Sequence, residues 1–246
     1  MPVAKREERG DDGILAGTRV AALIPAAGSG RRMGGPVAKP YLQLGGREIL
    51  ARTLEVFATC SVIDEVWLVV AAEHYDYCQR AIVERYGWQK VCGVVIGGAE
   101  RQESVWRGLQ QITAAIDLVV VHDGVRPFVT AAMLHQALRS AAQHGAAITA
   151  IPLQDTLKRV AETGVVEVTI PRQNLWRTQT PQAFRRTLLH AAFRHAWQHG
   201  LLATDEAGLI EAFGHPVQVV LGAESNIKIT TPEDLRWCEG FLPRFD

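Results

Sequence analysis

The stretch VAALIPAAGSGRRM, residues 20–33, joins an apolar run to a turn of small residues and then to a pair of arginines. It predicts a buried strand whose carboxyl end opens into a glycine turn, where backbone N–H groups can approach a ligand closely. Arg31 and Arg32 end the turn, and Lys39 follows soon after. Accessible N–H groups beside cations favour a binding site for a triphosphate.

This glycine turn differs from two common phosphate-binding loops. Met33 stands where the dinucleotide fingerprint GxGxxG requires its third glycine, and the GK[ST] ending of a Walker A loop is absent. A tight strand-to-helix turn without a ligand would also explain the glycines. Three cations in one short loop favour anion binding, because a purely structural turn needs none of them.

Composition sets limits on the class of protein. The chain has 246 residues, of which 48% are hydrophobic, enough for one large α/β domain or two small ones. Its formal net charge of +0 argues against a nucleic-acid partner, which would favour a basic excess. No apolar stretch approaches the roughly 20 residues of a membrane span, so no membrane partner is expected.

The cysteines and the first residues complete this picture. Cys60, Cys78, Cys92 and Cys238 form no CxxC motif, which predicts free thiols in a cytoplasmic protein. Residues 1–18 carry mixed charges and resemble no signal peptide, so we expect a disordered extension there. Residues 19–246 are then expected to form a single domain.

Short apolar runs alternate with helical patterns along the chain. The runs lie at residues 20–24, 66–70, 94–96, 118–121, 147–151 and 217–220. Runs of this length predict strands that are buried on both faces of a sheet. Helical periodicity covers residues 49–59, 133–141 and 188–196, and Thr231-Pro232 starts a final helix. The alternation predicts a three-layer α/β fold, a mostly parallel twisted sheet with helices on both faces.

Residues 152–178 interrupt the alternation. The segments 156–160 and 165–170 flank Glu162-Thr163-Gly164, which predicts an inserted β-hairpin. A hairpin alone has too little core to be stable, so we expect an arm at about residues 152–178 that mediates homodimerisation. The alternative is a hairpin that packs back on its own domain.

A second candidate segment is His122-Asp123-Gly124-Val125-Arg126-Pro127, which follows the run 118–121 directly. A carboxylate at the carboxyl end of a central parallel strand lies in the crevice where such sheets bind ligands. Asp123 can therefore hold Mg²⁺ or a substrate hydroxyl group, and Arg126 can hold Asp123 in place. A salt-bridged turn explains both residues equally well, and His122 is expected to be a buried histidine with a satisfied hydrogen bond.

Three other segments are weaker candidates. Residues 97–105 combine a strand end, a glycine turn and a helix start, and their backbone can approach a base or a ribose, although capping explains Ser104 equally well. Residues 204–207 predict a helix N-terminus. Lys228 lies between the last strand and the last helix, where a lone lysine usually faces solvent.

Taken together, these segments resemble the 2-C-methyl-D-erythritol 4-phosphate cytidylyltransferase family. The matching motifs are, in order, residues 25–33, 39–42, 97–101, 122–127, 155–156, 180–182, 204–207 and 226–228. The resemblance implies a nucleotide-diphospho-sugar transferase-like fold and the transfer of a cytidylyl group from CTP to 2-C-methyl-D-erythritol 4-phosphate, with release of pyrophosphate. It also implies a homodimer and Mg²⁺ held mainly by the CTP phosphates.

The resemblance further implies roles for individual residues. Arg32 and Lys39 would stabilise the transition state, while Arg172 and Lys228 would position the attacking phosphate. Arg172 and Thr156 would come from the hairpin of the neighbouring subunit. The residues that would face the hydroxyl groups of the alcohol are Asp123, Arg126 and Thr204. Those that would line the cytidine are Ala26, Ala27, Gly28, Gly98 and Ser104.

The sequence departs from the family pattern at two places and leaves two alternatives. Ala38-Lys39-Pro40 stands where Pro-Lys-Gln is expected, and Gly124-Val125 replaces two alanines. The alternatives are a cytidylyltransferase for another alditol phosphate, such as ribitol 5-phosphate, and a non-catalytic nucleotide-binding homologue. The Pro25-Ala26-Ala27-Gly28 start favours methylerythritol phosphate, and the retention of both transition-state cations favours an active enzyme.

Overall fold

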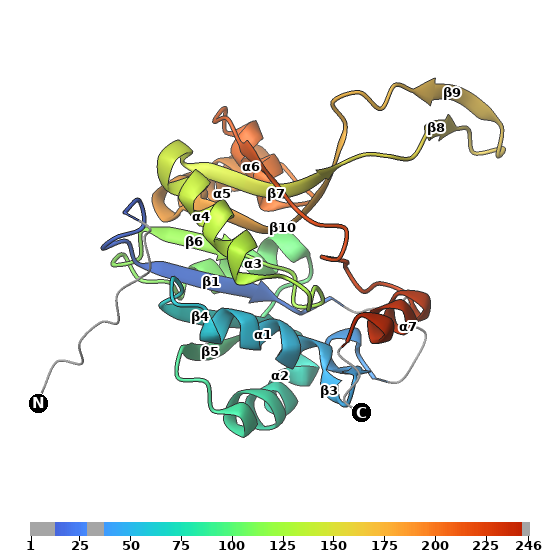
Figure 1. The fold of residues 1–246 in the computed structure, drawn as a ribbon. Coiled ribbons are helices and arrows are strands. Elements are labelled where there is room, and N and C mark those ends of the chain that lie inside the picture. Colours follow the sequence, from blue (N-terminus) through green and yellow to red (C-terminus); the bar gives the residue numbers. More distant parts are fainter. Residues whose placement is uncertain (1–12, 29–36, 243–246) are drawn as a thin grey trace, which may run out of the picture.

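The computed structural model describes residues 13–28 and 37–242, which are built around one seven-stranded sheet (Figure 1). The strands of the sheet are β1 (Val20–Pro25), β4 (Glu65–Val70), β5 (Val91–Ile96), β6 (Leu118–Val121), β7 (Ala146–Pro152), β10 (Trp176–Arg185) and β11 (Gln218–Leu221). Their order is β11-β7-β10-β6-β1-β4-β5. The pairs β1·β4, β1·β6, β4·β5 and β11·β7 are parallel, so the predicted mostly parallel sheet is confirmed.

Helices cover both faces of this sheet, as the alternation of patterns predicts. One layer contains α1 (Ile49–Thr59), α4 (Ala131–His144), the short α2 (Tyr75–Tyr77) and the π-helix that continues it (Cys78–Glu84). The other layer contains α3 (Arg101–Leu109), α5 (Arg186–His199) and α6 (Glu206–Ala212). A last helix, α7 (Pro232–Phe241), closes one end of the molecule (Figure 1).

Strand β1 shows how the sequence produces these layers. Val20, Ala22 and Ile24 belong to the core cluster that contains α1 and α4. Ala21 and Leu23 belong to the cluster that contains α3 and α5. Successive side chains of a strand point to opposite faces, so a continuous apolar run requires a covered sheet on both sides.

Strand β10 is the element that the sequence pattern does not predict. It pairs antiparallel with both β6 and β7, in the middle of the sheet. Pro181 lies within it, and a proline argues against a central strand because it has no N–H to donate. The register with β7 shifts between Thr178 and Gln182, and this irregularity lets the strand pass the proline while residues 179–184 stay buried.

The predicted hairpin forms from β8 (Leu157–Val160) and β9 (Val166–Ile170), which pair antiparallel. It extends away from the sheet and its helices rather than packing back on them (Figure 1). Its strands are exposed except for half-buried Ile170. Dimerisation through this arm stays a prediction.

The chain termini and caps complete the fold. Thr231 caps α7, where a helix start is predicted, and Thr130 caps α4; each accepts a hydrogen bond from a backbone N–H of the first turn. The expected disordered extension does not run to residue 18, because Leu15 is fully buried in the core and its carbonyl accepts a hydrogen bond from Thr18 N. Residues 1–12 lie outside the described residues.

Across residues 13–28 and 37–242, every helix is too short or too polar to cross a membrane.

Candidate active site

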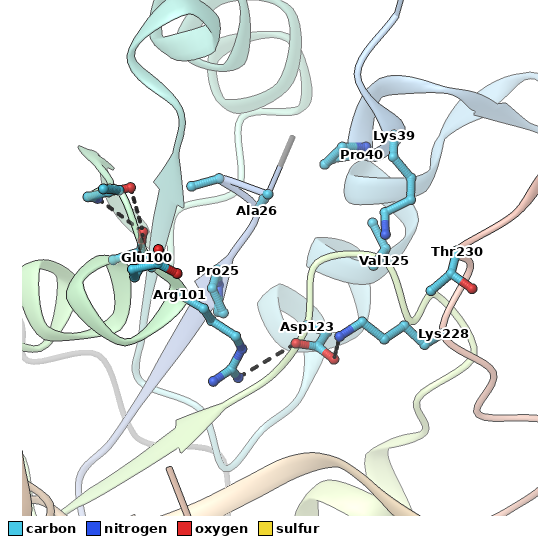
Figure 2. Close-up of a pocket in the computed structure, with 15 residues that line it drawn as sticks. Pro25, Ala26, Lys39, Pro40, Glu100, Arg101, Asp123, Val125, Lys228 and Thr230 are labelled. Atoms are coloured by element: carbon cyan, nitrogen blue, oxygen red, sulfur yellow. Dashed lines mark hydrogen bonds and ion pairs between the residues drawn. The ribbon is translucent and has the colours of Figure 1, made fainter. Parts of the chain in front are cut away.

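A cavity of about 520 Å³ opens at the carboxyl ends of β1, β5 and β6 (Figure 2). Parallel α/β sheets bind their ligands at this edge. Lys39 and Lys228 lie on one side of the cavity and Arg101 on the other, with Asp123 between them. The turn after β1, residues 25–28, lines the cavity with small side chains, so a ligand can approach its backbone.

Asp123 is the centre of a cluster of ion pairs at this edge. Its Oδ2 lies 2.9 Å from Lys228 Nζ and 3.4 Å from Arg126 Nε, and its Oδ1 lies 3.6 Å from Arg101 Nη2. Burial alone would raise the pKa of Asp123, but Lys228, Arg101 and Arg126 together hold that pKa well below its ordinary range. The carboxylate is therefore ionised at neutral pH and fixes three cations around the cavity.

His122 holds the segment that carries Asp123. The ring is fully buried, with Nε2 3.1 Å from Arg126 O and Nδ1 3.0 Å from Thr180 Oγ1. A carbonyl can only accept, so the neutral ring donates from Nε2 and accepts at Nδ1 from the Thr180 hydroxyl. The same hydroxyl oxygen accepts from Asp123 N at 3.1 Å. The prediction of a buried, satisfied histidine is confirmed.

This environment predicts a pH dependence of stability. Burial lowers the pKa of His122 from 6.5 to about 4, so between these pH values the ring is neutral in the folded protein and protonated in the unfolded chain. Its contribution of roughly 3 kcal/mol is complete above the unfolded pKa and is lost as the pH falls from about 6.5 to 4. Urea unfolding at several pH values measures this loss, and the His122→Phe variant should lack it. Equal pH slopes in the two proteins would contradict the assignment.

Lys228 is placed by a buried asparagine. Asn226 is fully buried and its Nδ2 donates to Thr180 O at 2.7 Å, while its backbone carbonyl oxygen accepts from Arg126 Nη1 at 2.7 Å. Ile229 N donates to Val125 O at 3.0 Å just beyond Lys228. These bonds tie the segment after β11 to the segment after β6. They hold Lys228 in the cavity, although sequence spacing alone favours a lysine that faces solvent.

Lys39 lies on a 3-10 helix, η2 (Lys39–Tyr41), whose other two residues are buried. The Tyr41 ring packs edge-on against His74 and Tyr77, with centroid distances of 5.1 and 5.0 Å. Pro40, the departure from the family pattern, occupies the first turn, where a missing N–H costs nothing. The substitution is thus compatible with a lysine that points into the cavity (Figure 2).

The loop after β5 forms the wall opposite the lysines. Gly98 N donates to Ser104 Oγ at 3.0 Å, so Ser104 both caps the loop and lines the cavity. A Cβ on Gly97 would lie 2.7 Å from Ser104 Oγ and 2.8 Å from Ala27 Cβ. The loop therefore packs directly against the turn after β1, and only glycine fits at residue 97.

Sequence reasoning missed one pair of residues in this wall. Arg101 Nη1 and Nη2 bind Glu206 Oε1 and Oε2 at 2.6 and 3.0 Å, and Glu206 is 1% exposed. Burial would lower the pKa of Arg101, but Glu206 and Asp123 raise it further above its ordinary value. The pair links α3 to α6 across the cavity edge. The sequence signal for this pair was an acidic residue in the first turn of α6, but helix capping explains such a residue more simply.

The structure brings most of the sequence-predicted site residues together. Those that line the cavity are Ala26, Ala27, Gly28, Lys39, Gly98, Ser104, Asp123 and Lys228. Arg126 is buried behind Asp123 rather than lining the cavity, and Thr204 is exposed before α6. Thr156 and Arg172 lie at the arm, where Arg172 Nη1 donates to Gln154 O. Arg32 lies outside the described residues.

Within the described ranges, no group of three or more His, Cys, Asp and Glu side chains could hold a metal ion. Two carboxylates line the cavity, Asp123 and Glu100, and Asp123 is already paired with cations. This donor set suits an ion that arrives on a ligand's own phosphates better than one held by a cage of protein ligands.

The cavity combines lysines on one side with an exposed backbone loop on the other, an arrangement that suits a phosphate-bearing ligand (Figure 2). Fold and site together define a nucleotidyltransferase of the α/β class. The model of the 2-C-methyl-D-erythritol 4-phosphate cytidylyltransferase family matches residues 20–244, and the chain belongs to this family.

Individual relatives agree with the family model. The chain is 47% identical over 226 residues to 2-C-methyl-D-erythritol 4-phosphate cytidylyltransferase of Geotalea uraniireducens, covering 91% of this chain and 97% of that one. It is 46% identical to the enzyme of the same name from Geobacter metallireducens, with the same coverage. The crystal structure of 4-diphosphocytidyl-2C-methyl-D-erythritol synthase from Anaerococcus prevotii matches with a TM-score of 0.81 at 34% identity, covering 94% and 99% of the two chains.

Proposed function

We propose that this chain transfers the cytidylyl group of CTP to 2-C-methyl-D-erythritol 4-phosphate in the non-mevalonate isoprenoid pathway. The products are 4-diphosphocytidyl-2-C-methyl-D-erythritol and pyrophosphate. The observation that carries the proposal is the cavity in which Lys39 and Lys228 face a backbone wall, in a chain that the family matches over residues 20–244.

The reaction is an in-line displacement at phosphorus. A phosphate oxygen of the alcohol phosphate attacks the α-phosphorus of CTP, the bond to the β-phosphate oxygen breaks, and pyrophosphate leaves with that electron pair. Positioning and charge stabilisation carry such reactions, because the protein forms no covalent bond. Lys39, together with Arg32, stabilises the negative charge at the α-phosphate. Lys228, held by Asp123 at 2.9 Å, orients the attacking phosphate.

Mg²⁺ is the proposed cofactor. Asp123 would be the protein carboxylate that contacts the ion, and the phosphate oxygens of CTP would supply most of its other ligands. When bound, the ion neutralises charge on the phosphates. Asp123 also keeps Lys228 oriented, so its role on the protein side does not depend on the ion.

We also propose a cytoplasmic location. All four cysteines are free, three of them buried and Cys92 exposed. Free thiols are typical of a reducing compartment.

The arm is proposed to complete the site of a second copy of the chain. Its strands carry apolar side chains that stay partly exposed in the single subunit: Leu157 (39%), Val160 (50%), Val166 (53%) and Val168 (44%). Thr156 directly precedes β8 and Arg172 follows β9, and both strands extend away from the sheet (Figure 1). In a two-fold symmetric dimer, each arm would bring both residues to the partner's cavity.

Mixing two inactive variants tests this arrangement. Arg172→Ala and Lys39→Ala, each inactive alone, are expected to recover about one quarter of wild-type turnover when refolded together in equal amounts. Half of the dimers are then mixed, and one of their two sites contains both Lys39 and the partner's intact arm. Mixing each variant with itself is the control. Absence of recovery, with mixed dimers shown by native mass spectrometry, would place Arg172 in the site of its own subunit.

The choice of acceptor tests the function itself. Pyrophosphate release is measured with Mg²⁺ and CTP in the presence of 2-C-methyl-D-erythritol 4-phosphate, ribitol 5-phosphate or neither. Release that requires methylerythritol phosphate supports the proposal. Release only with ribitol 5-phosphate would keep the mechanism and change the pathway, and binding of CTP without release would identify a non-catalytic homologue.

A further inference from the structure

The loop after β5 is held by two residues of α3 that do not themselves line the cavity. Ala99 N donates to Glu103 Oε2 at 3.0 Å, and Arg107 Nη1 donates to Gly97 O at 2.8 Å. Arg107 Nη2 and Glu103 Oε1 are 2.5 Å apart, which closes a ring between the loop and the helix. We call this arrangement of Glu103 and Arg107 the clasp.

The clasp and the loop are shaped for one another. A Cβ on Gly98 would lie 2.2 Å from Glu103 Cδ, so the carboxylate occupies the space that any side chain at residue 98 would take. The N–H of Ala99 and the Arg107 guanidinium lower the pKa of Glu103, which is therefore ionised. An ionised, ion-paired carboxylate holds one orientation of the loop more firmly than a neutral capping group would.

The clasp and Ser104 together decide which backbone groups the loop can offer to a ligand. Ser104 Oγ takes the N–H of Gly98, and Glu103 Oε2 takes the N–H of Ala99. Ser104 Oγ also lies 3.0 Å from Glu100 O, which accepts its hydroxyl proton. At residues 98 and 99 the backbone groups left for a base are therefore carbonyl oxygens, which accept hydrogen bonds.

We infer that Glu103 and Arg107 are positioning residues that set nucleotide choice at this wall. The inference rests on the proposed function, in which the nucleoside of CTP lies against this loop. Cytosine presents a 4-amino donor to acceptor oxygens, whereas uracil presents a carbonyl that would face them unpaired. Releasing the clasp frees the N–H of Ala99 and lets the loop offer a donor, so discrimination against uracil weakens.

The test compares CTP and UTP as donors for variants of the clasp. In Glu103→Ala, the ratio of kcat/KM for CTP to that for UTP is expected to fall by about tenfold or more. The loss should appear mainly in the KM for CTP, with kcat at saturation less affected. Glu103→Gln keeps an oxygen for Ala99 N but loses the charge that pairs with Arg107, so its ratio should lie between those of the wild type and Glu103→Ala. Glu55→Gln breaks another Arg–Glu ion pair, 2.7 Å to Arg47, away from the cavity, and should leave the ratio unchanged.

A double-mutant cycle separates the clasp from general destabilisation. The added Cβ of Gly98→Ala should displace the Glu103 side chain. The CTP-to-UTP ratio of kcat/KM should therefore fall as far in Gly98→Ala as in Glu103→Ala. The double variant should then be no worse than either single variant, because both changes release the same contact. The inference would be overturned if the losses of the two single variants multiplied in the double variant. An unchanged CTP-to-UTP ratio in folded Glu103→Ala would overturn it as well.

Binding measurements keep this test independent of the proposed reaction. Calorimetric Kd values for CTP and UTP, measured on wild type and on Glu103→Gln, require no turnover. Should the wild type bind CTP but form no product, the proposed function fails while the clasp is still judged by the ratio of the two Kd values. If the ratio of the two Kd values is the same in wild type and in Glu103→Gln, the role given to the clasp is wrong, even when wild-type turnover supports the function.

Discussion

Replacing Lys39 by methionine is expected to lower kcat by about 10²–10³-fold while the protein stays folded. The ammonium group lies in the cavity on a 3-10 helix whose Pro40 and Tyr41 are buried, so its position is fixed before substrate binds. A preorganised charge of this kind stabilises the negative charge that builds up in the transition state, at no reorganisation cost. Methionine keeps an unbranched stem of similar shape and removes only the charge.

The measurement is kcat at saturating CTP and acceptor, together with the thermal unfolding midpoint. Lys90→Met serves as the control, because it removes a lysine that donates to Cys60 O at 2.7 Å rather than one that faces the cavity. It should leave kcat unchanged. A kcat for Lys39→Met within a few-fold of wild type would contradict the role given to Lys39.

Asp123→Asn is expected to lower the free energy of unfolding by about 3 kcal/mol and to disrupt acceptor binding. The variant leaves Lys228, Arg126 and Arg101 around a buried neutral amide. Removing one member of a buried ion cluster costs more than the pair contributes, because Lys228 and Arg126 lose their counter-ion, while Arg101 keeps Glu206. Lys228 also loses its anchor, so kcat/KM for the acceptor should fall.

The pH dependence identifies this effect as electrostatic. The pKa of Asp123 is lowered in the folded protein, so its contribution is complete above the unfolded value of 3.8 and is lost as the pH falls further. Urea unfolding at pH 7 and at pH 3 should therefore show the variant closer to wild type at the lower pH. Asp76→Asn, at an exposed position of α2, should match wild type at both. A stability difference that is constant with pH would contradict the assignment.

Local patterns predicted most of the fold, because each buried element has its own periodicity in the sequence. The runs at 20–24 and 118–121 became β1 and β6, and helix α1 has the predicted bounds. Strand β5 begins at Val91 rather than at residue 94, since Gly93 breaks the apolar run where its backbone packs against the Trp67 ring. Strand β10 was missed because its sequence includes Pro181 and polar residues that only the finished sheet buries.

The candidate site was predictable where residues follow a strand directly, as Asp123 follows β6. Contacts between residues that are far apart in the sequence and meet only in the folded sheet were not predictable in this way. Arg101 and Glu206 are 105 residues apart and meet only because α3 and α6 lie on the same face of the sheet. Lys228 is likewise fixed by Asn226, whose partners come from the segments around β6 and β10. Sequence spacing carries no information on such pairings.

The most direct test of the account follows the label from CTP. The protein is incubated with Mg²⁺, 2-C-methyl-D-erythritol 4-phosphate and CTP labelled at either the α- or the γ-phosphorus. The α-label is expected in a product with the mass of 4-diphosphocytidyl-2-C-methyl-D-erythritol and the γ-label in pyrophosphate. An α-label that stays in CTP, or that moves to CMP whether or not the acceptor is present, would contradict it.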